Sequence, residues 1–254
     1  MDVNEFISKI RPFDLLVFKG SDGISSIIMM MQKFVTGIDG ASHVEIAMSP
    51  RYCSKIKTPL SSDAMFSWTS TLSGALNDGV NNAETDFSFF GIQFRKLNEL
   101  VFAYNDDPSA NIGVCRLINN PIERIEGETD KQYSDRMDKL KETMDKMYKK
   151  YNGRSYNFSP IALLAAIFPF IRPLRRRVQR QSAQRAQERY GLFCSEFVAS
   201  LYIDLGIIDD LTDGVADGTV SIVPGDVIPV DLINLDALNN EIRNPICEPP
   251  IWLK

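Results

Sequence analysis

Residues 193–205 read FCSEFVASLYIDL, and this stretch does most to indicate the fold. It is apolar over most of its length and Gly206 follows it, a pattern that predicts a short buried helix ending at the glycine. Cys194 stands at the start of the predicted helix. Peptide dipoles and free backbone N–H groups at a helix N-terminus favour a thiolate, and the same N–H groups can bind an oxyanion beside it. Cys194 is therefore a candidate nucleophile.

The single histidine of the chain lies in a second informative stretch, SHVEIAM over residues 42–48. Its alternation predicts a strand with His43 and Glu45 on one face and the larger apolar residues on the other. An imidazole held on one side of a strand can take the proton of a thiol, and a Cys–His pair supports acyl transfer through a thioester. Because the chain has no second imidazole, most histidine-based metal sites are excluded, and we expect neither a metal nor an organic cofactor.

Each of these residues also has an ordinary structural explanation. Cys194 would pack as a small hydrophobe on a core helix, and His43 would be a histidine whose hydrogen bonds are satisfied inside the protein. The two lie far apart in the sequence, so neither identifies the other. The remaining cysteines, Cys53, Cys115 and Cys247, are irregularly spaced and predict neither a zinc site nor a redox motif.

The other predicted elements place strands before the long helices. Strands are predicted at residues 14–18, 65–71, 89–94 and 112–118, and helices at residues 24–35 and 130–151. In the longer helix, apolar residues recur every three or four positions from Tyr133 to Tyr151, and Asn152-Gly153 ends it. Strands grouped apart from helices predict an α+β fold rather than a doubly wound sheet.

Six stretches, in this order, carry a family resemblance: DLLVFKG, SHVEIAM, WTST, GIQFRKL, YNGRSYNF and FCSEFVASLYIDLG. Over residues 12–205, with a gap at a basic segment, the set resembles the circularly permuted papain-like cysteine hydrolases. The resemblance is to the YiiX-like branch of the NlpC-type superfamily, with lecithin:retinol acyltransferase-like proteins as distant relatives. It implies a permuted papain-like α+β fold, with an antiparallel sheet and a nucleophile-bearing helix late in the chain. It also implies that Cys194 is the nucleophile and His43 the general base.

The family usually carries a third polar residue, often Glu, that orients the imidazole from the strand after the histidine. Related sequences resemble W-E-S-T at this point, whereas this chain has Thr69 in the carboxylate position. Threonine can accept a hydrogen bond but cannot offset the charge of an imidazolium. Ser67 is the alternative if the register slips by one side-chain period, and Glu45 is another, although we expect Glu45 to be an ordinary exposed strand residue.

The function implied by the resemblance is cysteine-dependent hydrolysis or transfer at an amide or ester. The substrate would be a peptide, a peptidoglycan-like amide or a lipid ester. The missing carboxylate at Thr69 motivates an alternative, in which a weak or inactive member of the family serves as a binding or structural protein. Members occur in bacteria and in large DNA viruses, so a virion component is included in that alternative.

The chain is expected to form one domain over residues 1–254, with a helical and basic insertion over residues 120–190 and a proline-rich C-terminal segment over residues 220–254 that wraps the surface. Residues 172–189 carry seven arginines and one acid, a local charge of +6 that leaves −11 for the rest of the chain. These arginines either pair with the acidic remainder or, next to the apolar residues 160–171, contact anionic lipid, an acidic protein or nucleic acid. The arginines considered for such a contact are Arg172, Arg175, Arg176, Arg177 and Arg180.

Composition and the N-terminus bear on location and partners. The net charge of −5 argues against general nucleic-acid binding by bulk charge. The first 20 residues lack the pattern of a secretory signal, and the longest apolar run, Pro160 to Ile171, is too short to cross a bilayer. We therefore expect an intracellular protein whose cysteines are thiols, packaged in a virion if it is encoded by a virus.

Overall fold

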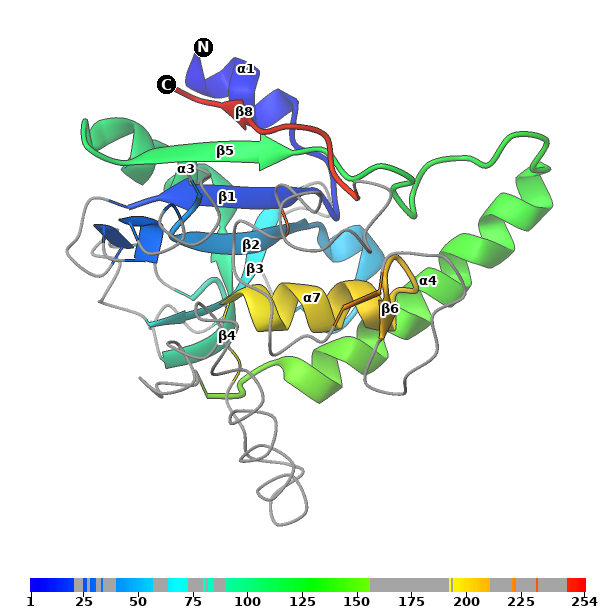
Figure 1. Cartoon of the computed structure of the whole chain (residues 1–254). Coiled ribbons are helices and arrows are strands. Elements are labelled where there is room, and N and C mark those ends of the chain that lie inside the picture. Colours follow the sequence, from blue (N-terminus) through cyan, green and yellow to red (C-terminus); the bar gives the residue numbers. More distant parts are fainter. Residues whose placement is uncertain are drawn as a thin grey trace.

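The computed structural model of this chain describes residues 1–20, 40–56, 64–72, 82–84, 90–155, 194–210, 221–222 and 246–254, with isolated positions at 25, 26, 28–30, 33, 80, 192 and 232. Its centre is a six-stranded antiparallel sheet in the order β4-β3-β2-β1-β5-β8 (Figure 1). The strands are β1 (Leu15–Lys19), β2 (His43–Met48), β3 (Phe66–Leu72), β4 (Phe90–Lys96), β5 (Asn111–Cys115) and β8 (Ile251–Trp252). Two short strands, β6 (Asp209–Asp210) and β7 (Ser221–Ile222), pair in parallel beside it.

Helices lie on both faces of the sheet, so the central strands are apolar on both sides (Figure 1). The described helices are α1 (Val3–Ser8), η1 (Pro50–Tyr52), α3 (Leu97–Asp106), α4 (Asp130–Tyr151) and α7 (Cys194–Asp204). In β1, Leu15 and Val17 join the core under α7 and α4, whereas Leu16 and Phe18 join the core under α1 and α3. The fold is thus mixed α+β with an antiparallel sheet, as predicted.

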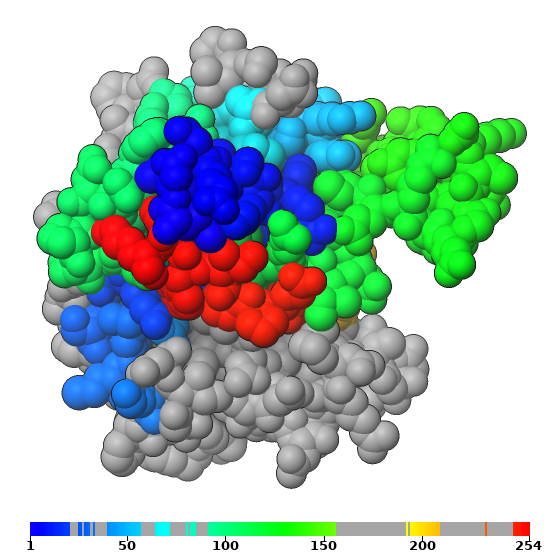
Figure 2. Space-filling model, turned by 90° about the horizontal axis from the view of Figure 1, so that it is seen from above, coloured from blue at the N-terminus to red at the C-terminus, as the bar shows by residue number. Residues whose placement is uncertain are grey.

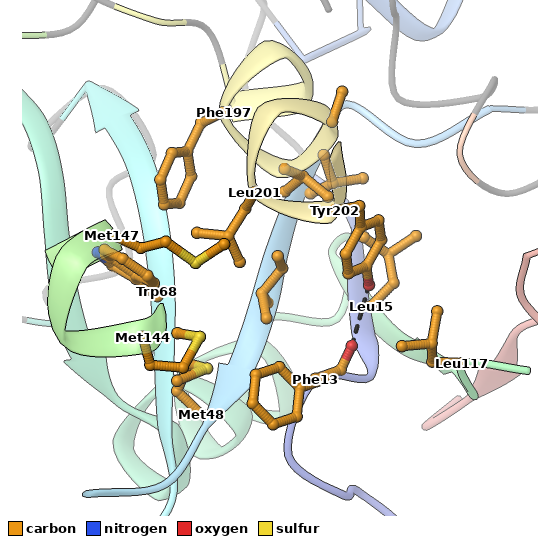
Figure 3. Packing of buried hydrophobic residues seen from close by; sticks show 14 of the residues in the cluster. Phe13, Leu15, Met48, Trp68, Leu117, Met144, Met147, Phe197, Leu201 and Tyr202 are labelled. Carbon is orange, nitrogen blue, oxygen red and sulfur yellow. Dashed lines mark hydrogen bonds between the residues drawn. The ribbon is translucent and has the colours of Figure 1, made fainter. Parts of the chain in front are cut away.

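Helix α7 is the element that carries the candidate nucleophile, and it packs on β2 and β3. Figure 3 shows Phe197, Leu201 and Tyr202 pointing from α7 into the core that covers the strands. The Tyr202 hydroxyl donates a hydrogen bond of 3.0 Å to the backbone carbonyl of Phe13, which stands just before β1 (Figure 3). Phe13 has a φ of +72°, a conformation that costs energy for a bulky side chain and is held here by its contacts. The helix is therefore anchored to the start of β1 as well as to the sheet.

Helix α4 has the predicted bounds, and its sequence explains both ends. Thr129 and Gln132 form a capping box at the N-terminus, and Gly153 beyond the C-terminus adopts a φ of +77°. The apolar side of the helix packs against the core beside α7, where Met144 and Met147 are buried (Figure 3). This half of the predicted insertion thus contributes to the core of the domain. Half of the predicted helix over residues 24–35 lies outside the described residues, and the described positions 25, 26, 28–30 and 33 are helical.

The C-terminal segment contributes to the sheet in the residues that the structure describes. Strand β8 pairs with β5 and completes the sheet, and both Cys247 and Leu253 are buried. Figure 2 shows this segment, in red, beside the blue N-terminal helix, and the Met1 amino group lies 3.3 Å from the Leu253 carbonyl oxygen. A two-residue strand carries too little periodicity to be recognised in a sequence, because its pairing depends on a partner far along the chain.

Candidate functional site

The Cys194 thiol lies at the first residue of α7, as the sequence predicted, and backbone N–H groups converge on it. It is hydrogen bonded by the backbone of Ser195, in its own helix, and by the backbone of Val44 in β2. The pairing of β2 with β3 runs from Ile46 to Met48 on the β2 side. Val44 precedes the residues that pair with β3, so its backbone can face the helix on that side. The sulfur therefore sits where the N-terminus of α7 meets the beginning of β2.

His43 is the first residue of β2, and its imidazole bridges the thiol and a second set of polar groups. The ring is hydrogen bonded to Cys194. Its Nε2 atom lies 2.9 Å from Glu45 Oε1 and 3.0 Å from Thr69 Oγ1. Because Nε2 is engaged by these two oxygens, Nδ1 is the ring nitrogen left to face the thiol. Phe18, from the neighbouring strand, packs against the other side of the ring with centroids 5.5 Å apart.

Burial and charge act on this pair in opposite directions. Burial alone would lower the pKa of His43, but the Cys194 thiolate and the Glu45 carboxylate outweigh it and raise the pKa to about 9. Burial alone would raise the pKa of Cys194, but the His43 imidazolium and the two backbone N–H groups outweigh it and lower the pKa. Both shifts favour the thiolate–imidazolium form over the neutral pair.

The other three cysteines behave differently although all four are free thiols. Burial raises the pKa of Cys53 and of Cys115 to about 12, and it raises the pKa of Cys247 as well. Cys194 is therefore the one cysteine of the chain whose surroundings favour the reactive thiolate.

Glu45 corrects the sequence prediction most clearly. It was expected to be exposed, but its side chain has 0% exposure and its Oε1 atom accepts from His43. The same oxygen forms an ion pair with Arg95 of β4. Burial would raise the pKa of Glu45, but Arg95, His43 and the nearby Ser67 hydroxyl outweigh it and lower the pKa to about 2. A carboxylate therefore does face the imidazole, and it comes from the histidine's own strand.

The structure brings all five predicted site residues together: Cys194, His43, Thr69, Ser67 and Glu45. Thr69 contacts the imidazole directly, whereas Ser67 lies beside Glu45. Sequence reasoning missed Arg95. Its one signal was the alternation of β4, which sets Arg95 on the face opposite Phe94, because a charged residue inside a largely apolar strand needs a partner.

The described residues that flank the basic segment, Ser155 and Leu192, lie side by side near this site. The backbone N–H of Leu192 lies 3.3 Å from the carbonyl oxygen of Ser155, and the carbonyl of Leu192 accepts from the Ser70 hydroxyl. Both ends of the intervening chain thus meet two residues from Cys194. The apolar residues 160–171 and the arginines considered for contact with lipid, an acidic protein or nucleic acid fall between them and lie outside the described residues.

The described residues contain no group of three or more His, Cys, Asp or Glu side chains arranged to hold a metal ion. Among them, no helix combines the length and the apolar character that crossing a membrane requires.

Comparison with models of protein families finds no family that matches this chain. Comparison with curated proteins also finds no match.

Proposed function

We propose that this protein is a cysteine-dependent hydrolase or acyltransferase of permuted papain-like fold, with Cys194 as nucleophile and His43 as general base. The observation that carries the proposal is the contact of the Cys194 thiol with the His43 ring, at a helix N-terminus and with a carboxylate behind the ring. These are the parts of an activated cysteine nucleophile: a lowered thiol pKa, an adjacent base and a group that orients the base.

The proposed reaction begins when the Cys194 thiolate attacks the carbonyl carbon of an amide or ester. The negative charge moves to the carbonyl oxygen, where backbone N–H groups at the start of α7 stabilise it. The His43 imidazolium then gives its proton to the leaving nitrogen or oxygen as the bond to the carbonyl carbon breaks, which leaves a thioester on Cys194. Water or an acceptor alcohol or amine attacks the thioester, gives its proton to His43, and releases the thiolate.

Three substrate classes present the carbonyl that this chemistry needs: peptides, peptidoglycan-like amides and lipid esters. The site supports the reaction type, while the choice among substrates depends on surfaces around the thiol. The orienting role that the family resemblance assigns to Thr69 is extended here to Glu45, because only a carboxylate can offset the charge on the imidazolium.

The test is the rate at which iodoacetamide labels Cys194 as a function of pH, in the wild type and in His43→Ala, with labelled peptides quantified by mass spectrometry. We expect the wild-type midpoint to lie below the free-thiol value of roughly 8.5, and the midpoint of His43→Ala to lie at that value or above. Cys53, Cys115 and Cys247 are internal controls that should label slowly. Equal midpoints in the two proteins would count against the proposal.

The low exposure of the pair favours a second function. Cys194 is 6% and His43 4% exposed, so little of either side chain is accessible to a substrate. A protein that kept the fold as a binding or structural component would show this burial without turnover. In that case Cys194 would label only after denaturation, and the wild type and Cys194→Ser would be indistinguishable with peptide and lipid-ester substrates.

A further inference from the structure

A buried arginine lies behind the Cys194–His43 pair. Arg95 in β4 is 2% exposed, and its Nη2 atom contacts Glu45 Oε1, the same oxygen that lies 2.9 Å from His43 Nε2. The guanidinium of Arg95, the carboxylate of Glu45 and the imidazole of His43 are thus joined through one oxygen atom. Each of these groups belongs to a strand, so the sheet itself sets their spacing.

The sheet register explains how an arginine two strands away reaches Glu45. Arg95 is paired with Ser67, and Ser67 is paired with Ala47, so these three residues form one row across β4, β3 and β2. Glu45 lies on the same face of β2, two residues before Ala47. The small side chains of Ser67 and Ala47 leave room for the long arginine to cross β3 diagonally and meet the carboxylate.

Each of the two buried charges explains why the other group can stay ionised inside the protein. A carboxylate with 0% exposure would be costly to keep ionised, and a fully buried guanidinium cannot lose its charge. Paired, their charges offset one another in a medium where opposite charges attract strongly. Among the described residues, the charged and titratable groups that act on His43 and Glu45 from the surrounding strands and helix are Cys194, Glu45, His43 and Arg95.

In the thiolate form these four groups alternate in sign, from Cys194 through His43 and Glu45 to Arg95, and their charges sum to zero. Without Arg95 the buried site would carry one uncompensated negative charge. Protonation of Glu45 would remove that charge at the lowest cost, because burial favours the neutral carboxyl. His43 would then lose the anion that faces Nε2.

We propose that Arg95 is a positioning residue that keeps the Glu45 carboxylate ionised and directed at His43. This inference rests on the proposed function, since it assigns Arg95 to the same site. In the described part of the chain, Arg95 contacts Glu45 and Glu45 contacts His43, so Arg95 acts on the imidazole through that carboxylate.

The test uses the fact that His43 is the single histidine of the chain, so its ring signals in a nitrogen-15 NMR spectrum need no assignment. The midpoint of the His43 titration is compared in the wild type, Arg95→Met, Arg95→Lys and the exposed control Arg51→Met. We expect Arg95→Met to lower the midpoint by about one pH unit or more, a tenfold loss of imidazolium at a given pH. Arg95→Lys should have a midpoint close to the wild-type value because lysine keeps the positive charge. Arg51→Met should have the wild-type midpoint.

A midpoint in folded Arg95→Met that equals or exceeds the wild-type value would overturn the inference. If Arg95→Met does not fold, two variants that keep the buried site neutral replace it, Arg95→Lys and the double variant Glu45→Gln/Arg95→Met. The His43 midpoint in the double variant should lie at least one pH unit below the midpoint in Arg95→Lys, about the shift expected when an ion pair is lost. Equal midpoints in these two would also overturn the inference.

The titration needs no substrate and no turnover, so its outcome is separate from that of the labelling experiment. If His43→Ala changes the labelling of Cys194 but the Arg95 variants leave the His43 midpoint unmoved, the proposed function stands and the role of Arg95 fails. If Cys194 labels alike in the wild type and in His43→Ala, the proposed function fails whatever the Arg95 variants show.

Discussion

Replacing Glu45 with glutamine removes the carboxylate on which both His43 and Arg95 depend, and the structure predicts a large loss of stability. The side chains of Glu45 and Arg95 are 0% and 2% exposed, so neither charge is solvated when its partner is lost. Breaking a buried ion pair by removing one member typically costs about 3–5 kcal/mol, because the other charge remains buried. Since domains are stable by only about 5–15 kcal/mol, the effect should be conspicuous.

Urea unfolding of Glu45→Gln, Arg95→Met and the double variant measures this as a double-mutant cycle. We expect the double variant to be destabilised by at least about 2 kcal/mol less than the sum of the two single variants, because it leaves no unpaired charge. A loss of stability for Glu45→Gln below about 1 kcal/mol, the value typical of an exposed pair, would contradict a buried ion pair at this position. Strict additivity of the two changes would refute it equally.

Four further predictions follow from individual contacts. Thr69→Val removes only a neutral hydrogen bond to the imidazole, so it should move the His43 NMR titration by less than about half a pH unit. Ser67→Leu should obstruct the path of Arg95 across β3 and lower the His43 midpoint, whereas Ser67→Ala should not. Gly113→Ala places a Cβ atom 2.8 Å from a Trp252 ring carbon, so the free energy of unfolding, measured by thermal unfolding, should fall by about 1–3 kcal/mol. Because the pKa of Glu45 falls from 4.5 to about 2 on folding, its contribution to stability is complete above pH 4.5 and is lost as the pH falls through 2, and Glu45→Gln should abolish this part of the acid transition.

Local sequence patterns were sufficient for the elements whose signals are periodic. Helix α4 has the predicted bounds because its apolar spacing, its N-terminal capping box and its glycine stop all lie within the helix or next to it. Strand β2 and helix α7 were likewise predicted within a residue or two of their observed ends. Helix α3 was missed although Leu97, Leu100, Val101 and Tyr104 have helical spacing, because it follows β4 without an intervening turn signal.

The candidate site also depends on contacts between distant residues, which local sequence patterns do not predict. Local patterns predicted Cys194 at a helix start and His43 on a strand, because both features depend on neighbours a few residues away. The burial of Glu45 depends on the fold, because alternation tells which residues share a face of a strand but not what covers that face. The fold also determines that Arg95 meets Glu45 across β3 and that β8 pairs with β5, because the register between strands depends on turns and packing far from the residues concerned.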